Sequence, residues 1–109
     1  MNQVLFREDR ADDSSLIYPT AASVRGRVLA ALLRGEQLTQ ADALRRWATS
    51  RLGSSIYQLR KEFGWPIVTT EIEVETRDNG RVATVARYWL PNHAIRLAGA
   101  RGQRFATSA

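Results

Sequence analysis

The apolar positions of residues 22–63 recur with a period of about 3.6, which predicts helices rather than strands. The first helix is expected over 22–34. Ser23 belongs to the residue types that cap helix N-termini, and Gly35, just beyond the last apolar position, is typical of a helix end. The apolar face of this helix is formed by Val24, Val28, Leu29, Leu32 and Leu33.

A second and a third helix follow, with only a short turn between them. The second is expected over 40–47, because Thr39 is a good N-cap and Asp42 stands at the third helical position, where a capping box carries an acidic residue. The third is expected over 51–63, with Ser50 as its N-cap. Its single apolar stripe is formed by Leu52, Ile56, Leu59 and Phe63.

After the third helix the pattern changes from helical to alternating. Two β-rich runs, residues 67–76 (IVTTEIEVET) and 81–90 (RVATVARYWL), follow one another. The dipeptide Asn79-Gly80 between them is a strong signal for a tight hairpin turn. We therefore expect the two runs to pair antiparallel, with the tip near 78–80.

Three helices followed by a β-hairpin predict an α+β fold of the winged helix-turn-helix class over 21–91, with the hairpin as the wing. The flanking segments are expected to be flexible. Residues 1–20 contain an acidic run and are predicted to form a mobile N-terminal arm. Residues 92–109 are predicted to form a basic C-terminal tail, with at most a short helix capped by Asn92.

Three stretches occur in the order RVLAALLRGEQLTQADALRRW (27–47), RLGSSIYQLRKEFGWPI (51–67) and VARYWL (85–90). They resemble a winged helix-turn-helix family common among bacteriophage and prophage proteins. The resemblance spans roughly two thirds of the chain and implies the same architecture, DNA binding and a phage-type role. The family often has Phe-Gly before the turn between its second and third helices, where this chain has Trp47-Ala48.

The charge of the chain agrees with an anionic partner. The formal net charge is +5, and all but one of the sixteen basic residues are Arg. Arg donates two parallel hydrogen bonds from a planar group, which suits phosphate and guanine. A coding bias towards Arg explains the composition equally well. The positive balance itself still indicates a polyanion.

With its apolar stripe buried, helix 51–63 presents a polar side that fits the major groove of DNA, and five residues are candidates for base reading. Arg51 is expected to reach guanine and Gln58 adenine, each through two hydrogen bonds. Ser54 and Ser55 are short and allow close approach, and Lys61 completes the polar side. The alternative is an ordinary solvated helix face.

Five residues are candidates for contacts with the DNA backbone near the second and third helices. Arg45 and Arg46 precede the turn, where the first helix of the motif crosses the phosphates. Thr39 and Gln40 stand at a helix N-terminus, which attracts phosphate. Tyr57 lies at the boundary of the apolar stripe, and we expect partial burial with its hydroxyl near a phosphate or water. Each of these side chains has an alternative as a solvated or packing residue.

The wing has two further candidates, Arg77 and Arg81, on either side of the predicted turn. At a projecting tip they can lie along phosphates or enter the minor groove. The alternative is ion pairing with Glu75 and Asp78 across the hairpin. The alternating acids Glu71, Glu73 and Glu75 repel phosphate, so their side of the hairpin is expected to face away from DNA or towards a basic partner.

Catalysis and cofactors are not expected. The chain has no Cys and a single His, and it contains no phosphate-binding Gly-rich loop or nucleophile motif. We therefore expect no enzyme, no metal site, no cofactor and no small-molecule ligand. No apolar run is long enough for a transmembrane helix. The expected location is the cytoplasm of a bacterial cell or phage-infected host.

The combined interpretation is a sequence-specific double-stranded DNA-binding protein, a phage- or prophage-type transcriptional regulator. It would place helix 51–63 in the major groove and the 77–81 wing on the backbone. The alternative is a winged-helix module that docks on or dimerises with proteins without binding DNA. The sequence leaves the oligomeric state open, a homodimer included.

Overall fold

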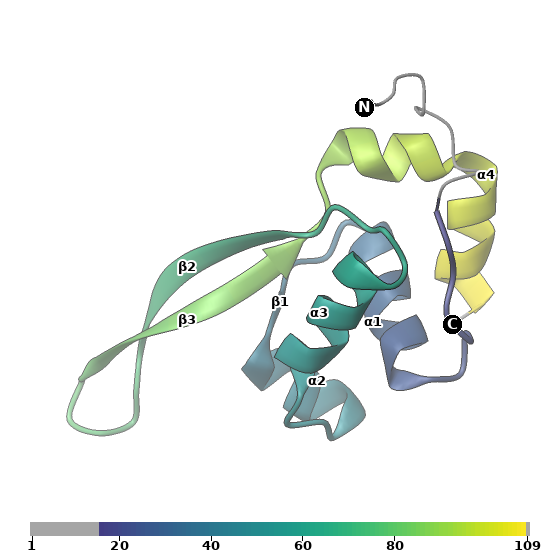
Figure 1. Ribbon diagram of the computed structural model, residues 1–109. Helices are drawn as coiled ribbons and strands as arrows, with labels where there is room; N and C mark the ends of the chain where they lie inside the picture. The colour runs from purple at the N-terminus through teal and green to yellow at the C-terminus, as the bar shows by residue number, and fades with distance from the viewer. Residues whose placement is uncertain (1–15, 109) are drawn as a thin grey trace.

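The computed structural model describes residues 16–108 and contains, within them, four helices and a three-stranded antiparallel sheet (Figure 1). Helices α1–α3 pack together, the β2–β3 hairpin projects from one side of them, and α4 lies against α1 on the other. This arrangement confirms the α+β winged helix-turn-helix prediction. The elements are α1 (Val24–Leu33), β1 (Leu38–Thr39), α2 (Gln40–Trp47), α3 (Leu52–Lys61), β2 (Val68–Glu75), β3 (Val82–Trp89) and α4 (Asn92–Ser108).

The core lies between α1, α3 and the base of the sheet. Ser23 caps α1 as predicted, because its hydroxyl accepts a hydrogen bond of 3.0 Å from the N–H of Gly26. A Cβ at Gly26 would overlap the carbonyl oxygen of Thr20, so the chain can enter α1 this closely only with Gly at that position. The large core side chains of α1 and α3 with almost no exposed surface are Val28, Leu29, Leu32, Leu52, Ile56 and Leu59.

The turn between α2 and α3 is held by side chains at the start of α2. The predicted capping box is present: the Thr39 hydroxyl accepts from the Asp42 N–H, and the Asp42 carboxylate accepts from the Thr39 N–H at 2.9 Å. The Gln40 side chain spans the turn, donating from Nε2 to the Thr49 carbonyl (2.7 Å) and accepting at Oε1 from the Leu52 N–H (3.0 Å). These bonds fix the direction in which α3 leaves α2.

Ala48 ends α2 in the left-handed region, with φ 54° and ψ 31°. A side chain with a Cβ is strained there by about 1–2 kcal/mol, whereas Gly is not. We expect Ala48→Gly to stabilise the fold by about 1 kcal/mol, measured from urea unfolding at unchanged m value. Ala41→Gly, within the right-handed part of the same helix, is the control and should destabilise it. Equal effects of the two substitutions would contradict the prediction.

The sheet is built around β3, which pairs with β1 on one edge and with β2 on the other. The β2–β3 hairpin runs in register from the pair Val68–Trp89 at its base. Asn79 and Gly80 both have positive φ, 55° and 73°, and the Arg81 N–H donates to the Asp78 carbonyl (3.1 Å) across them. The strands stop pairing at Glu75–Val82, so this turn lies within a longer connection over residues 76–81. The predicted hairpin and its tip are confirmed.

Strand β1 was not predicted, because a strand of two residues is too short to show an alternation of apolar and polar positions. It exists because Leu38 is buried in the core and pairs with Tyr88. The short strand therefore connects the segment after α1 to the base of the hairpin.

Residues after 91 form α4, so the prediction of a loose tail with at most a short helix is wrong. The helix begins at Asn92, which is its first residue instead of its cap, and it is kinked at Gly99. A Cβ at Gly102 would lie only 2.5 Å from the Cβ of Ala98, on the other side of the kink, so this position requires a glycine. The buried residues of α4 are all small and spaced four apart: Ala94, Ala98, Gly102 and Ala106.

The segment before α1 is attached to the end of α3. Leu16 is buried, and the N–H of Ile17 donates to the carbonyl of Phe63 at 3.3 Å. The predicted mobile arm falls mainly on residues 1–15, which lie outside the described residues. From Leu16 onwards the chain packs on the domain.

Glu36, between α1 and β1, accepts hydrogen bonds from Arg34 and Arg46 and so connects the end of α1 to α2. Partial burial raises the pKa of Glu36, but the hydrogen bonds and positive charges of the two Arg residues outweigh it, and the pKa lies below the usual 4.5. A carboxyl group with a lowered pKa stabilises the fold above its unfolded-state pKa, and the contribution disappears as the pH falls through the folded-state value.

We expect Glu36→Gln to destabilise the fold at pH 7 by up to about 1 kcal/mol, a small value because the side chain is about one-third exposed. The difference from the wild type should shrink as the pH falls below 4.5 and vanish once the carboxyl group is protonated in the folded state. Thermal unfolding across pH measures it. Glu62→Gln is the control, because Glu62 has no ion pair with the described residues. A loss that persists unchanged at pH 3 would contradict the role of the carboxylate.

Candidate nucleic-acid interface

Helix α3 turns one face to the core and leaves the other uncovered. Leu52, Ile56 and Leu59 point inwards. In Figure 1 none of the described elements passes in front of α3. The exposed residues of this helix are Gly53, Ser54, Tyr57 and Lys61, and we call them the α3 face.

Two residues of α3 lie differently from their predictions. Ser55 is only 8% exposed and faces the core, which removes it from the candidate base-reading residues. Tyr57 was expected to be partly buried, but it is 61% exposed and stands at the centre of the α3 face. The uncovered side of α3 is therefore centred on Tyr57, and Gln58 lies at its edge.

Gln58 lies at the margin of the α3 face and is half-buried. Its Oε1 accepts a hydrogen bond of 2.9 Å from Nη1 of Arg25, near the start of α1. The Arg25 guanidinium also lies over the ring of Phe63, 5.7 Å from its centroid. Arg25 was not among the predicted site residues, because no local pattern connects positions 33 residues apart.

At the start of α3, Arg51 is the N-cap residue and its side chain is exposed. The prediction that Ser50 caps the helix is wrong. The Arg51 N–H donates to the hydroxyl of Thr49 at 3.1 Å, and the next N–H is satisfied by Gln40 from α2. Because α2 supplies the cap, the Arg51 side chain remains available next to Ser54.

The candidate backbone residues of α2 are mostly engaged within the protein. Thr39 belongs to the capping box, and both polar atoms of the Gln40 amide hold the turn. Arg46 pairs with Glu36 and stacks over the Trp47 ring, 4.7 Å from its centroid. Arg45 pairs with Asp42 at 2.7 Å but keeps most of its surface exposed. Arg45 is therefore more accessible to a phosphate than Arg46.

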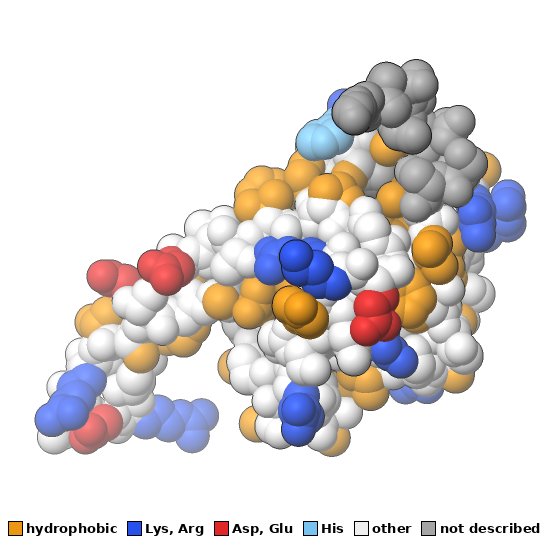
Figure 2. All heavy atoms as spheres, viewed as in Figure 1, with side chains coloured by type: hydrophobic (Ala, Val, Ile, Leu, Met, Phe, Trp, Pro, Cys, Tyr) orange, Lys and Arg blue, Asp and Glu red, His pale blue; other side chains and the backbone are white. Residues whose placement is uncertain are grey.

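The wing carries its two predicted Arg residues at an exposed tip. Arg81 lies 3.6 Å from Asp78, a loose pair between exposed side chains. Arg77 makes no ion pair with any described residue. Figure 2 shows basic side chains at the hairpin tip and on the helical body on the side from which α3 is seen. Cations of the wing and of the helical body thus lie on the same side of the molecule as α3 (Figure 2).

Arg60 contributes to the fold instead of to an interface. Its Nε donates to the Ile67 carbonyl at 2.9 Å, and its guanidinium also bonds to the Thr69 hydroxyl. These bonds fix the base of β2 against the end of α3. They set the position of the hairpin relative to the α3 face.

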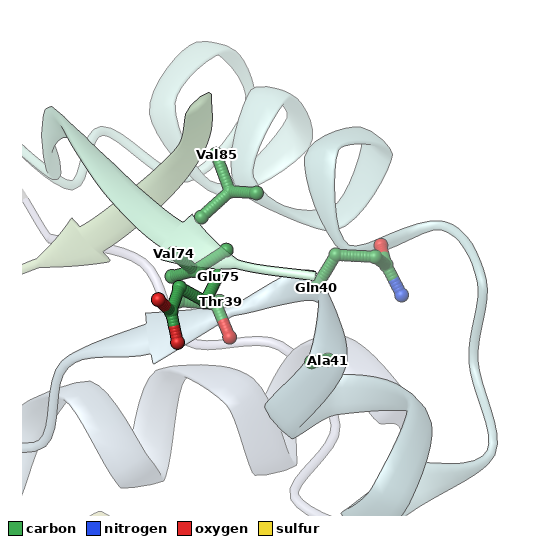
Figure 3. A pocket seen from close by; sticks show the side chains of 6 residues that line it. All are labelled: Thr39, Gln40, Ala41, Val74, Glu75 and Val85. Carbon is green, nitrogen blue, oxygen red and sulfur yellow. The ribbon is translucent and has the colours of Figure 1, made fainter. Parts of the chain in front are cut away.

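A shallow groove of about 310 Å³ separates the hairpin from the start of α2. Figure 3 shows its lining side chains between these elements. Most of the lining is apolar, and Glu75 is its one acidic residue. The lining residues are Thr39, Gln40, Ala41, Val74, Glu75 and Val85.

Within residues 16–108, no helix is both long and apolar enough to span a lipid bilayer. No curated protein and no solved structure matches the chain. A family model described as winged helix-turn-helix domain matches residues 24–93, which is more than half of the chain and includes every element from α1 to β3. This family suggests DNA binding in general. The chain therefore belongs to the winged helix-turn-helix domain family.

Proposed function

We propose that the protein binds double-stranded DNA in a sequence-specific manner and acts as a phage- or prophage-type transcriptional regulator in the cytoplasm. The α3 face would enter the major groove, with Arg51 and Gln58 at its margins, while Arg77 and Arg81 of the wing contact the adjacent backbone. The activity is binding, without catalysis, cofactor or small-molecule ligand. A homodimer on two half-sites is compatible with this function.

One observation carries the proposal: the second helix of a helix-turn-helix motif has an uncovered face of small and polar residues. Gly53 and Ser54 are short enough for the helix backbone to approach base edges. Tyr57 and Lys61 follow one turn and two turns further along the same face. An α-helix with this profile fits the width of the B-DNA major groove.

The test is a titration of duplex DNA at two or more salt concentrations. About six phosphate contacts would give a slope of about −5 in a plot of log affinity against log salt. Arg51→Ala should relax the sequence preference, whereas Arg81→Ala should weaken all duplexes alike and make the slope shallower by about 1. Selection from a random duplex pool would report the preference and any half-site symmetry. Absence of duplex binding at low salt would refute the proposal.

A second candidate function is protein docking, and the groove beside the hairpin favours it. Val74 and Val85 expose apolar surface there, next to the acidic alternation of β2. This function predicts that Val74→Glu abolishes binding of a protein partner while Ser54 variants do not. Duplex affinity at moderate salt that depends on the α3 face would decide against it.

A further inference from the structure

The hydrogen bond between Arg25 and Gln58 bears on which base the protein would read, and the following inference rests on the proposed DNA binding. Gln58 projects from the second turn of α3, where a recognition helix still reaches base edges. Arg25 comes from a different helix, α1, and donates to Oε1 of the Gln58 amide.

A free Gln recognises adenine with both ends of its amide. Oε1 accepts from the adenine N6 amino group, and Nε2 donates to N7. In this protein, Oε1 already accepts the charged Nη1 donor of Arg25 at 2.9 Å. The guanidinium is itself positioned over the Phe63 ring, so the donor has little freedom to leave.

The other end of the amide is available. Gln58 Nε2 makes no hydrogen bond with the described part of the chain. It carries two N–H donors and no acceptor. With Oε1 turned towards α1, the group left for a base edge is therefore a donor.

We infer that Arg25 makes Gln58 a donor-only reader that selects guanine in place of adenine. The major-groove edge of guanine presents two acceptors, N7 and O6, and no donor, whereas adenine presents its N6 donor beside N7. Because Oε1 is directed towards Arg25, adenine would place its N6 amino group against the Nε2 donor instead of an acceptor. Arg25 acts here as a positioning residue through Gln58.

The experiment combines selection from a random duplex pool with a double-mutant comparison. Gln58→Ala first identifies the base position that Gln58 reads, as the position whose preference is lost. Wild type should select guanine there. Arg25→Met should shift that one position towards adenine by about tenfold, with the other positions unchanged. In the Gln58→Ala background, Arg25→Met should leave base preference unchanged.

Arg27→Met is the matched control, because Arg27 lies on the same helix, is exposed and makes no side-chain hydrogen bond or ion pair with the described residues. It removes the same charge and should weaken all duplexes without moving the preference. In the free proteins, the side-chain amide NMR signal of Gln58 should shift in Arg25→Met and remain in place in Arg27→Met. That signal also reports whether Arg25→Met is folded.

Two results would overturn the inference while leaving the proposed function in place. One is an Arg25→Met protein that weakens all duplexes alike, as Arg27→Met does. The other is a wild type that selects adenine at the Gln58 position. Failure of the wild type to bind any duplex would overturn the proposed function and the inference together.

Discussion

Replacing Trp65 with Ala is expected to destabilise the fold by about 3–5 kcal/mol, the range for removing a large buried aromatic side chain. Trp65 is 1% exposed and follows directly on the end of α3. Its indole N–H donates to the Ile17 carbonyl at 2.7 Å, and its ring meets Tyr18 edge-on with centroids 5.2 Å apart. The substitution would leave a cavity and a partly buried carbonyl without its donor.

Urea unfolding monitored by circular dichroism measures this loss, because the signal does not depend on the replaced tryptophan. Trp65→Phe is the matched control, since it keeps an aromatic ring beside Tyr18 and removes the N–H donor. It should cost about 1–2 kcal/mol. A domain of this size has about 5–15 kcal/mol of stability in total, so the Ala variant would be marginal at 37 °C. A loss below about 1 kcal/mol would contradict the packing of residues 16–18 against the end of α3.

The parts of the fold that could be predicted are those with local signals. Ser23 caps α1, and Thr39 with Asp42 forms the capping box of α2, each within a few residues of the groups it bonds. Asn79-Gly80 likewise sets the hairpin turn through its own backbone conformation. These signals need no knowledge of the rest of the molecule.

The extent of α4 could not be predicted from the same signals. Its buried stripe consists of Ala and Gly, which add little to a hydrophobic period, and Gly99 and Gly102 resemble helix ends in sequence. The helix is held by a partner that lies far away in the chain. Arg34, just beyond α1, donates to the Ala106 carbonyl at 2.7 Å.

The sequence predicted which residues of the candidate site are exposed more accurately than it predicted their hydrogen-bond partners. Helical spacing correctly separated the core residues of α3 from Ser54 and Lys61. It could not show that Gln58 is held by Arg25 or that the Gln40 amide is used in the turn. The first joins α1 to α3, and the Gln40 amide joins α2 to the turn and to the start of α3. These bonds decide which donor and acceptor atoms of the Gln58 and Gln40 side chains remain available to a DNA base.

Ser54→Glu is expected to reduce duplex affinity by a hundredfold or more, about 3 kcal/mol, with folding stability unchanged or slightly higher. Ser54 lies on the α3 face in the first turn of the helix, and its side chain makes no hydrogen bond with the described residues. A carboxylate there would be inserted between two phosphate backbones, and opposing like charges at an interface cost several kcal/mol. The same carboxylate is favourable to the helix itself, because it lies near the positive end of the α3 dipole.

Because Ser54→Glu should weaken DNA binding without weakening the fold, a loss of affinity cannot be explained by unfolding. Gln103→Glu, on the exposed side of α4, changes the net charge by the same amount far from α3. It should reduce affinity only slightly, through the overall charge. Fluorescence anisotropy with a labelled duplex, together with thermal unfolding of both variants, separates the two effects. If Ser54→Glu and Gln103→Glu weakened binding equally, DNA would be held by net charge alone, and the α3 face would not be the surface that enters the groove.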